Sequence, residues 1–164
     1  MYLPYGYPLR QYSPPQNSLS QGMDQHCLPS ALERVKKAVQ GEKEDELFYQ
    51  HLIAMAPTQE AKDVIATIRD DERKHNQMFR LIYRSYTGQD IAPSEEETFQ
   101  QPESYSEGLR TALFGELRAV ENYRKIKQCL SGYVYQQMLF EIITDELKHA
   151  TKYNYLFTLA KLGG

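Results

Sequence analysis

Apolar residues recur at steps of three and four along most of the chain from Ser30 onward, which is the spacing of one face of an α-helix. The pattern predicts a first helix over residues 30–56, a second over 58–87, a third over 105–130 and a fourth that ends near residue 162. No segment shows the strict alternation of a β-strand. We therefore expect an all-α fold, and helices of this number and length favour a four-helix bundle.

Residues with strong local preferences mark where these helices begin and end. Caps and stops satisfy or interrupt backbone hydrogen bonds at helix ends, and the candidates are a Ser30–Glu33 capping box, Pro57 before a Thr58 cap, a Gly88 stop and a Ser131-Gly132 break. Each pair of helices is expected to form a hairpin around its short turn.

Two segments fall outside the helical pattern. Residues 1–28 are rich in Tyr, Pro, Gln and Ser and show no periodicity, so we expect a disordered or loosely docked tail ahead of one folded domain over residues 29–164. Residues 88–104 contain two prolines and an acidic run, and they form a long crossover between the second and third helices. A connection of this length reaches from one end of such a bundle to the other.

The two predicted hairpins repeat one design at a fixed offset of 74 residues, as the differences 116 − 42 and 146 − 72 show. The matched sets are Glu42, Tyr49, Asp71, Glu72 and His75 in the first half and Glu116, Tyr123, Asp145, Glu146 and His149 in the second. In each hairpin the two glutamates lie equally far from the turn. Because both helices rise equally per residue, their carboxylates are expected at one height, near the middle of the bundle.

Glutamate and histidine interrupt otherwise apolar helix faces. The two faces read Ile65, Ile68, Glu72, His75, Phe79, Ile82 and Leu139, Ile142, Glu146, His149, Tyr153, Leu156. A buried carboxylate without a partner is strongly unfavourable unless it is neutralised. A solvated face or a structural polar network is the ordinary explanation for a single Glu-x-x-His. Two copies at one offset, level with two further glutamates, favour a metal site instead.

Two divalent cations would balance the charge of four carboxylates, and neutral imidazoles would complete their coordination. Residues i and i+3 point to the same side of a helix, so each Glu-x-x-His can present both side chains to metal. Oxygen and imidazole ligands suit two Fe ions, or alternatively two Mn ions. The expected ligands are Glu42, Glu72, His75, Glu116, Glu146 and His149.

Composition narrows the class of protein. The net charge is −3, and 41% of the residues are hydrophobic, so we expect a globular protein that binds neither nucleic acid nor a membrane. Cys27 and Cys129 lie far apart in the sequence and form no C-x-x-C, which excludes a zinc or rubredoxin-type site built from cysteine. We expect reduced cysteines and a cytoplasmic location, with a bacterial spore coat as the alternative.

The constellation resembles the ferritin-like di-iron carboxylate proteins, and within them the rubrerythrins. In both halves a Gly-Glu pair is followed by an aromatic residue seven positions after the Glu, in GEKEDELFY (41–49) and GELRAVENY (115–123). The resemblance covers residues 30–162 and implies a ferritin-like bundle of two helical hairpins. It implies terminal carboxylates at Glu42 and Glu116, bridging carboxylates at Glu72 and Glu146, and nitrogen ligands at His75 and His149.

The resemblance also suggests residues around the centre. Ala119 stands where rubrerythrins carry an extra glutamate, and we hypothesise that Asp45 or Glu46 supplies that carboxylate, with a solvated acidic patch as the alternative. Metal-bound histidines usually donate their other N–H to a carboxylate, and in the similar bacterioferritin-like proteins the equivalent aspartates bind a histidine across the bundle. The resemblance therefore pairs Asp71 with His149 and Asp145 with His75, with a salt bridge from a surface aspartate to a nearby Arg or Lys as the alternative. Tyr49 and Tyr123 would hydrogen-bond the terminal glutamates, act as redox-active rings or simply pack in the core.

The function implied is that of a di-iron oxidoreductase that reduces peroxide or O₂, or oxidises Fe(II), in defence against oxidative stress. Rubrerythrins carry a rubredoxin domain that this sequence lacks, so an external electron donor protein is expected, and we expect a homodimer. The alternatives are manganese-catalase-like dismutation of peroxide, iron storage, and a structural role in a bacterial spore coat.

Overall fold

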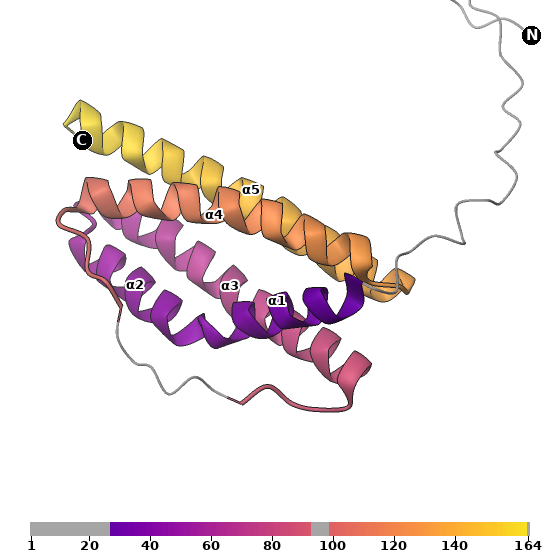
Figure 1. The fold of residues 1–164 in the computed structure, drawn as a ribbon. Coiled ribbons are helices and arrows are strands. Elements are labelled where there is room, and N and C mark those ends of the chain that lie inside the picture. The colour runs from indigo at the N-terminus through magenta and orange to yellow at the C-terminus, as the bar shows by residue number, and fades with distance from the viewer. Residues whose placement is uncertain (1–26, 93–98, 164) are drawn as a thin grey trace, which may run out of the picture.

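The computed structural model describes residues 27–92 and 99–163, without the side chains of Glu42 and Lys43. The predicted tail over residues 1–28 therefore lies almost entirely outside the described residues. Five helices make up the described fold, and no strand occurs in these ranges (Figure 1). They are α1 (Leu28–Gln40), α2 (Glu42–Met55), α3 (Gln59–Thr87), α4 (Tyr105–Cys129) and α5 (Tyr133–Leu162). The all-α expectation is confirmed, and no described helix is long and apolar enough to cross a bilayer.

The prediction of one continuous first helix was wrong, because the chain forms α1 and α2 in its place. They meet at Gly41, whose N–H donates to the Lys37 carbonyl and whose carbonyl accepts from the Asp45 N–H, so backbone bonding continues on both sides. The Ser30–Glu33 capping box was also wrong. Helix α1 begins at Leu28, and Pro29 occupies its first turn, where a missing N–H costs nothing.

The other predicted helix ends agree with the structure. The Thr58 hydroxyl accepts a 3.1 Å hydrogen bond from the N–H of Ala61 and caps α3. At the other end of α3, Gly88 has a φ of 69°, the left-handed conformation in which glycine closes a helix. The end of α3 and the start of α4 lie at opposite ends of the bundle, as expected for a crossover between two hairpins (Figure 1).

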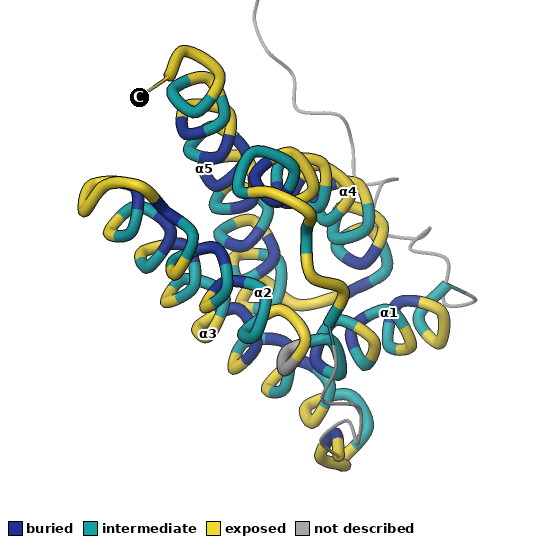
Figure 2. Tube along the Cα trace, turned by 90° about the vertical axis from the view of Figure 1, so that its left-hand side faces the viewer, coloured by how far each residue is buried: buried dark blue, intermediate teal, exposed yellow. Residues whose placement is uncertain are grey.

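Two apolar clusters fill the bundle, one at each end. The cluster beside α1 includes Val35, Phe79, Ile82, Leu139 and Ile142. The cluster beside α2 includes Leu52, Ile65, Ile68, Tyr153 and Leu156. Figure 2 shows the buried positions on the sides of the helices that face one another. The stretches of α3 and α5 that separate the two clusters are the two Glu-x-x-His motifs, so a polar layer crosses the middle of an apolar core.

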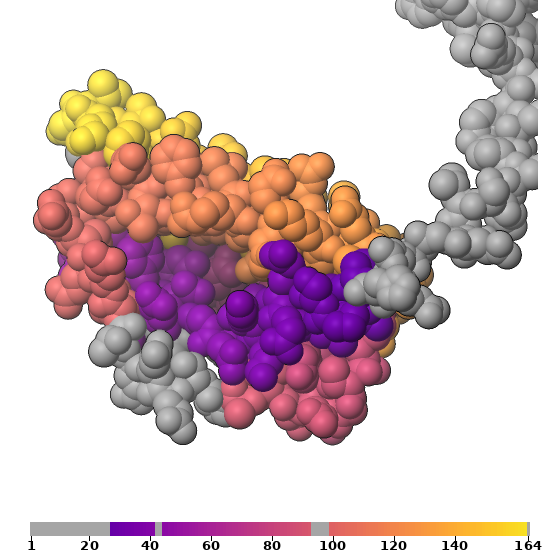
Figure 3. All heavy atoms as spheres, viewed as in Figure 1, coloured from indigo at the N-terminus to yellow at the C-terminus, as the bar shows by residue number. Residues whose placement is uncertain are grey.

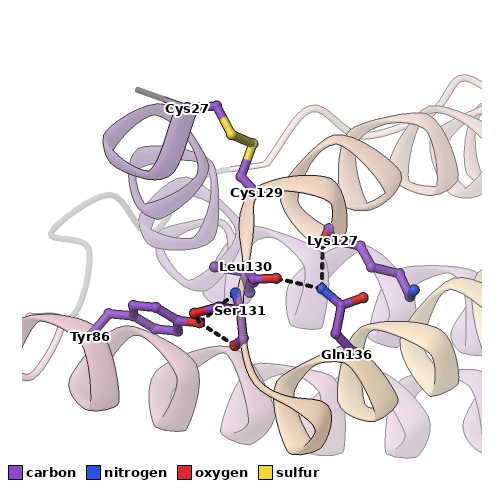
Figure 4. Close-up of a disulfide and its surroundings, with 7 residues drawn as sticks. All are labelled: Cys27, Tyr86, Lys127, Cys129, Leu130, Ser131 and Gln136. Carbon is purple, nitrogen blue, oxygen red and sulfur yellow. Dashed lines mark hydrogen bonds between the residues drawn. A yellow bond between two sulfur atoms is a disulfide. The ribbon is translucent and has the colours of Figure 1, made fainter. Parts of the chain in front are cut away.

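The turn between α4 and α5 is tied to two neighbouring elements (Figure 4). The Tyr86 hydroxyl donates to the Ser131 carbonyl at 2.5 Å and accepts from the Ser131 N–H at 2.9 Å. A disulfide joins Cys27, at the start of α1, to Cys129, at the end of α4. The expectation of reduced cysteines was therefore wrong, because the fold brings these two distant positions to a Cα separation of 5.6 Å.

Candidate metal centre

The polar layer brings together five of the six expected metal ligands. Helix α3 supplies Glu72 and His75, α4 supplies Glu116, and α5 supplies Glu146 and His149. His149, His75 and Glu146 are at most 1% exposed and Glu116 is 6% exposed. The side chain of Glu42, the sixth expected ligand, lies outside the described residues. Ligand atoms of Glu72, Glu116, Glu146 and His149 all lie within 4.8 Å of one another.

Glu72 and Glu146 each reach both histidines with different oxygens. Nδ1 of His149 lies 3.0 Å from Oε1 of Glu72, and Nδ1 of His75 lies 3.5 Å from Oε2 of the same carboxylate. For Glu146 the distances are 3.2 Å from Oε1 to Nδ1 of His75 and 3.9 Å from Oε2 to Nδ1 of His149. A carboxylate that divides its two oxygens between two imidazoles has the arrangement needed to bridge two cations, one beside each histidine.

The buried ligand atoms themselves indicate a site suited to cations. Four side-chain atoms of this layer are buried and make no hydrogen bond, namely Glu72 Oε1, His75 Nδ1, Glu146 Oε1 and His149 Nδ1. Buried polar atoms are nearly always satisfied, and an unsatisfied one is costly. Two imidazole nitrogens and two carboxylate oxygens that converge without forming hydrogen bonds fit the donor set of iron or manganese.

The pKa values of the buried histidines and of Glu116 show that the carboxylates of this layer favour positive charge beside them. Burial alone would lower the pKa of both imidazoles, but the carboxylates of Glu146 and Glu72 raise the pKa of His75 to about 10 and that of His149 to about 9. Burial and the neighbouring Glu146 raise the pKa of Glu116 well above its ordinary value. Without cations, this environment therefore favours protons on both imidazoles and on Glu116.

Two aspartates hold the histidines from outside, in the pairs that the sequence predicted. Nε2 of His149 lies 3.0 Å from Oδ2 of Asp71, and Nε2 of His75 lies 3.2 Å from Oδ2 of Asp145. Burial alone would raise the pKa of both aspartates, but hydrogen bonds from the histidines and from Lys148 lower it. An ionised carboxylate only accepts hydrogen bonds, so each Nε2 donates and each Nδ1 faces the glutamates.

Lys148 connects the two aspartates, and sequence reasoning missed it. Its Nζ lies 2.6 Å from Oδ1 of Asp145 and 3.2 Å from Oδ2 of Asp71. The signal was present in the repeat, because both DERKH and DELKH place a lysine directly before the histidine. The counterpart in the first copy, Lys74, has a different partner and pairs with Glu141.

The two acidic residues considered for an additional carboxylate have different surroundings. Glu46 points toward α3, where both of its oxygens bind the Arg73 guanidinium, at 2.5 and 3.2 Å. Asp45 is exposed and lines a cavity that leads to the centre. An additional carboxylate from this segment is therefore better placed at Asp45 than at Glu46.

This cavity, of about 790 Å³, lies between α2 and α4 and reaches the carboxylates of Glu72, Glu116 and Glu146. Figure 3 shows this face of the molecule hollowed between the two helices. Ala119 lines the cavity, and its small side chain leaves open space there. Apart from Arg118, the charged residues among the described lining are acidic.

Tyr49 and Tyr123 also line the cavity, one from α2 and one from α4. Burial, with Glu72 and Glu116 nearby, raises the pKa of Tyr49 well above its ordinary value. Burial, with Glu146 and Glu72 nearby, does the same for Tyr123. Both phenols are therefore neutral and stand beside the carboxylates, which keeps them candidates for hydrogen bonding to the centre.

Tyr153 is a third tyrosine of this region, and sequence reasoning treated it only as part of the core. It lies one helical turn after His149, has no exposed surface, and its hydroxyl makes no hydrogen bond. Its counterpart in the first half is Phe79 (153 − 74 = 79), whose ring lies 4.9 Å from that of Tyr123. The exchange of Phe for Tyr between otherwise matching halves was the signal that could have found it.

Comparison with known proteins places this architecture in a family. The sequence profile of the family described as Rubrerythrin matches residues 33–153. The protein YhjR of Bacillus subtilis is 28% identical over 127 residues, which make up 77% of this chain and 86% of YhjR.

Two solved structures share the fold. A conserved hypothetical protein from Mycobacterium tuberculosis matches with a TM-score of 0.66 at 17% identity, over 77% of this chain and 97% of that one. A hypothetical protein from Pyrococcus furiosus matches with a TM-score of 0.64 at 18% identity, over 87% of this chain and 92% of that one. At these identities the likeness concerns the fold alone.

Proposed function

The chain belongs to the rubrerythrin family, and on this premise we propose that it is a di-iron oxidoreductase that reduces peroxide or O₂. The observation that carries the proposal is the convergence of four buried ligand atoms without hydrogen-bond partners, contributed by Glu72, His75, Glu146 and His149. A structural polar network would align these atoms into hydrogen bonds, whereas His149 Nδ1 lies 3.0 Å from Glu72 Oε1 and His75 Nδ1 lies 3.2 Å from Glu146 Oε1 without forming one.

The described residues suggest how two ions would be held. The carboxylates of Glu72 and Glu146 and the Nδ1 atoms of His75 and His149 would hold the ions, and Glu116, whose Oε2 is 3.9 Å from Nδ1 of His149, would add a further carboxylate. When bound, a pair of ferrous ions supplies two electrons, one from each ion, which with two protons convert hydrogen peroxide to two molecules of water as the O–O bond breaks.

The chain orients the two imidazole rings, keeps water away from the polar layer and leaves a path from the surface to it. The Asp71–His149 and Asp145–His75 hydrogen bonds fix each imidazole ring with Nδ1 toward the centre. The two apolar clusters exclude water above and below the layer. The cavity between α2 and α4 offers a path for a small molecule, and its acidic lining attracts cations.

Anaerobic titration of the iron-loaded protein tests the proposal. Elemental analysis should find two iron ions per chain, and stepwise addition of peroxide should consume one molecule for every two ferrous ions without release of O₂. Glu116→Gln should weaken iron binding, whereas Glu121→Gln, exposed on the same helix beside Arg124, should not. Release of O₂ with no oxidation of the metal would replace this proposal with dismutation, and failure to bind iron or manganese would remove it.

A further inference from the structure

A second groove of the molecule, between α1 and α4, is lined by positive charge. It has a volume of about 490 Å³, and Arg34 and Lys37 line it from α1 while Arg118 lines it from α4. Glu33 is the one acidic residue of its described lining. Figure 3 shows α1 and α4 side by side on this face. We call this feature the basic groove, and it stands out in a chain whose net charge is −3.

The internal repeat relates the basic groove to the cavity that reaches the metal centre. At the 74-residue offset, its lining residues other than Arg34 correspond to residues that line that cavity, because positions 30–38 of α1 match 104–112 of α4 and positions 118–123 of α4 match 44–49 of α2. Arg118, Ala119 and Tyr123 line both, so the two lie next to each other. The fold therefore forms the same kind of groove once in each half.

The two grooves differ in charge at matching positions. Arg118 of the basic groove corresponds to Glu44 of the cavity, and Lys37 corresponds to Thr111. Both exchanges make the basic groove more positive. Since the same architecture accepts either set of side chains, the positive charge is not needed to build the bundle, and it favours an anion where the cavity favours a cation.

The two guanidinium groups of the basic groove are available to a ligand. Within the described residues, neither Arg34 nor Arg118 forms an ion pair with a carboxylate. Nη1 of the half-buried Arg34 instead donates a 2.6 Å hydrogen bond to the neutral Oδ1 of Asn122, which holds the side chain without neutralising it. Five other arginines do pair with carboxylates, namely Arg69, Arg73, Arg84, Arg110 and Arg124.

We propose that the basic groove binds a small molecule that carries a phosphate group. Two planar guanidinium groups and an ammonium group supply the charged donors that phosphate oxygens accept best. The Ser30 hydroxyl and the Asn122 amide line the same groove and add neutral donors. The volume is within the range of small-molecule sites, so there is room for an organic phosphate. This inference depends on the groove alone and does not rest on the metal chemistry.

Isothermal titration calorimetry of the full chain tests the proposal. The probes are inorganic phosphate, adenosine 5′-monophosphate and, as the matched compound without phosphate, adenosine. We expect one molecule of a phosphate probe to bind per chain and adenosine not to bind. The comparison of the two phosphate probes distinguishes an organic phosphate from free phosphate. An ionic strength of about 0.15 M screens charges more than about 8 Å apart, so distant cations contribute little.

A pair of double variants distinguishes the groove from the general charge of this face. K37T/R118E gives the basic groove the residues of its counterpart, so it should fold, as circular dichroism would show. It should weaken binding by about 100-fold or more, because each charged donor contributes roughly tenfold. K125T/R124E makes the same change of charge at exposed positions of α4 outside the groove, and it should keep the wild-type affinity within about threefold.

Binding that K37T/R118E removes and K125T/R124E preserves would support the proposal. The absence of binding for both phosphate probes would overturn it, and so would an equal loss of affinity in the two double variants. Binding of duplex DNA by a protein that binds neither phosphate probe would also overturn it, and would assign these cations to a nucleic-acid surface instead.

Discussion

His149 on α5 and Asp71 on α3 are joined across the bundle by a 3.0 Å hydrogen bond between Nε2 and Oδ2. Asp71 directly precedes Glu72, so one short stretch of α3 both carries a carboxylate of the centre and holds a histidine on the facing helix. The Asp145–His75 pair repeats this arrangement with the helices exchanged, because α5 supplies the aspartate and α3 the histidine. The two halves of the chain therefore orient each other's ligands.

Replacement of either aspartate should weaken metal binding without removing a ligand. Asp71→Asn keeps the size of the side chain but no longer provides a charged acceptor for the N–H of His149, and such changes typically cost about 10–100-fold in metal affinity. Competition with a chelator measures the effect. Asp70→Asn is the matched control, because Asp70 is exposed and binds Arg69 and Arg73 instead. Equal affinities for the two variants would contradict the orienting role.

The unpartnered hydroxyl of Tyr153 should be unfavourable in protein stripped of metal. A buried polar group without a hydrogen bond costs about 1–3 kcal/mol, so Tyr153→Phe should raise the free energy of unfolding by about 1 kcal/mol. Urea unfolding in the presence of a chelator measures the change.

The repeat supplies the reverse substitution as a control. Phe79→Tyr would place a hydroxyl at the matching site, where the side chain is 2% exposed, and should lower the free energy of unfolding. A loss of stability in Tyr153→Phe would mean that the hydroxyl has a partner in solution, such as an ordered water.

The repeat made much of this centre predictable from the sequence. A fixed offset between two Glu-x-x-His motifs, two turns and two further glutamates determines which residues share a level, because helices rise regularly. The Asp71–His149 pair was predicted differently, from the resemblance to ferritin-like proteins, and the 3.0 Å contact agrees with it.

Features that depend on the exact approach of distant segments could not be predicted. The Cys27–Cys129 disulfide requires the start of α1 to meet the end of α4, and no local pattern reports that contact. The bridging position of Lys148 depends on how α3 and α5 are rotated toward each other. The break at Gly41 has no strong sequence signal, because its backbone remains in the right-handed helical region.

Loss of the disulfide should destabilise the protein. Cys27 and Cys129 are 102 residues apart, and closing a loop of this size stabilises a fold by about 2–5 kcal/mol, chiefly by restricting the unfolded chain. We expect a reductant to lower the free energy of unfolding of the wild type by that amount, which urea unfolding would show as a lower midpoint. Cys27→Ser should have the lower midpoint from the outset and should not respond to reductant. A wild-type midpoint that reductant leaves unchanged would show that the bond does not contribute.

Two glycines of α4 should respond oppositely to replacement by alanine, although alanine is favoured over glycine in helices by about 1 kcal/mol. A Cβ at Gly108 would collide with Cδ2 of Leu52 and lie 3.1 Å from Cγ of Pro102. Leu52 is fully buried and has little room to move, so Gly108→Ala should lower the free energy of unfolding by about 1–3 kcal/mol.

At Gly115 the nearest atom to an added Cβ is Nη2 of Arg118, 3.9 Å away. The helix preference then acts without opposition, and Gly115→Ala should raise the free energy of unfolding by about 0.5–1 kcal/mol. Urea unfolding of the two variants side by side measures the difference. Because the backbone preference is common to both sites, stabilisation by both substitutions would show that α4 does not pack against Leu52 as closely as described.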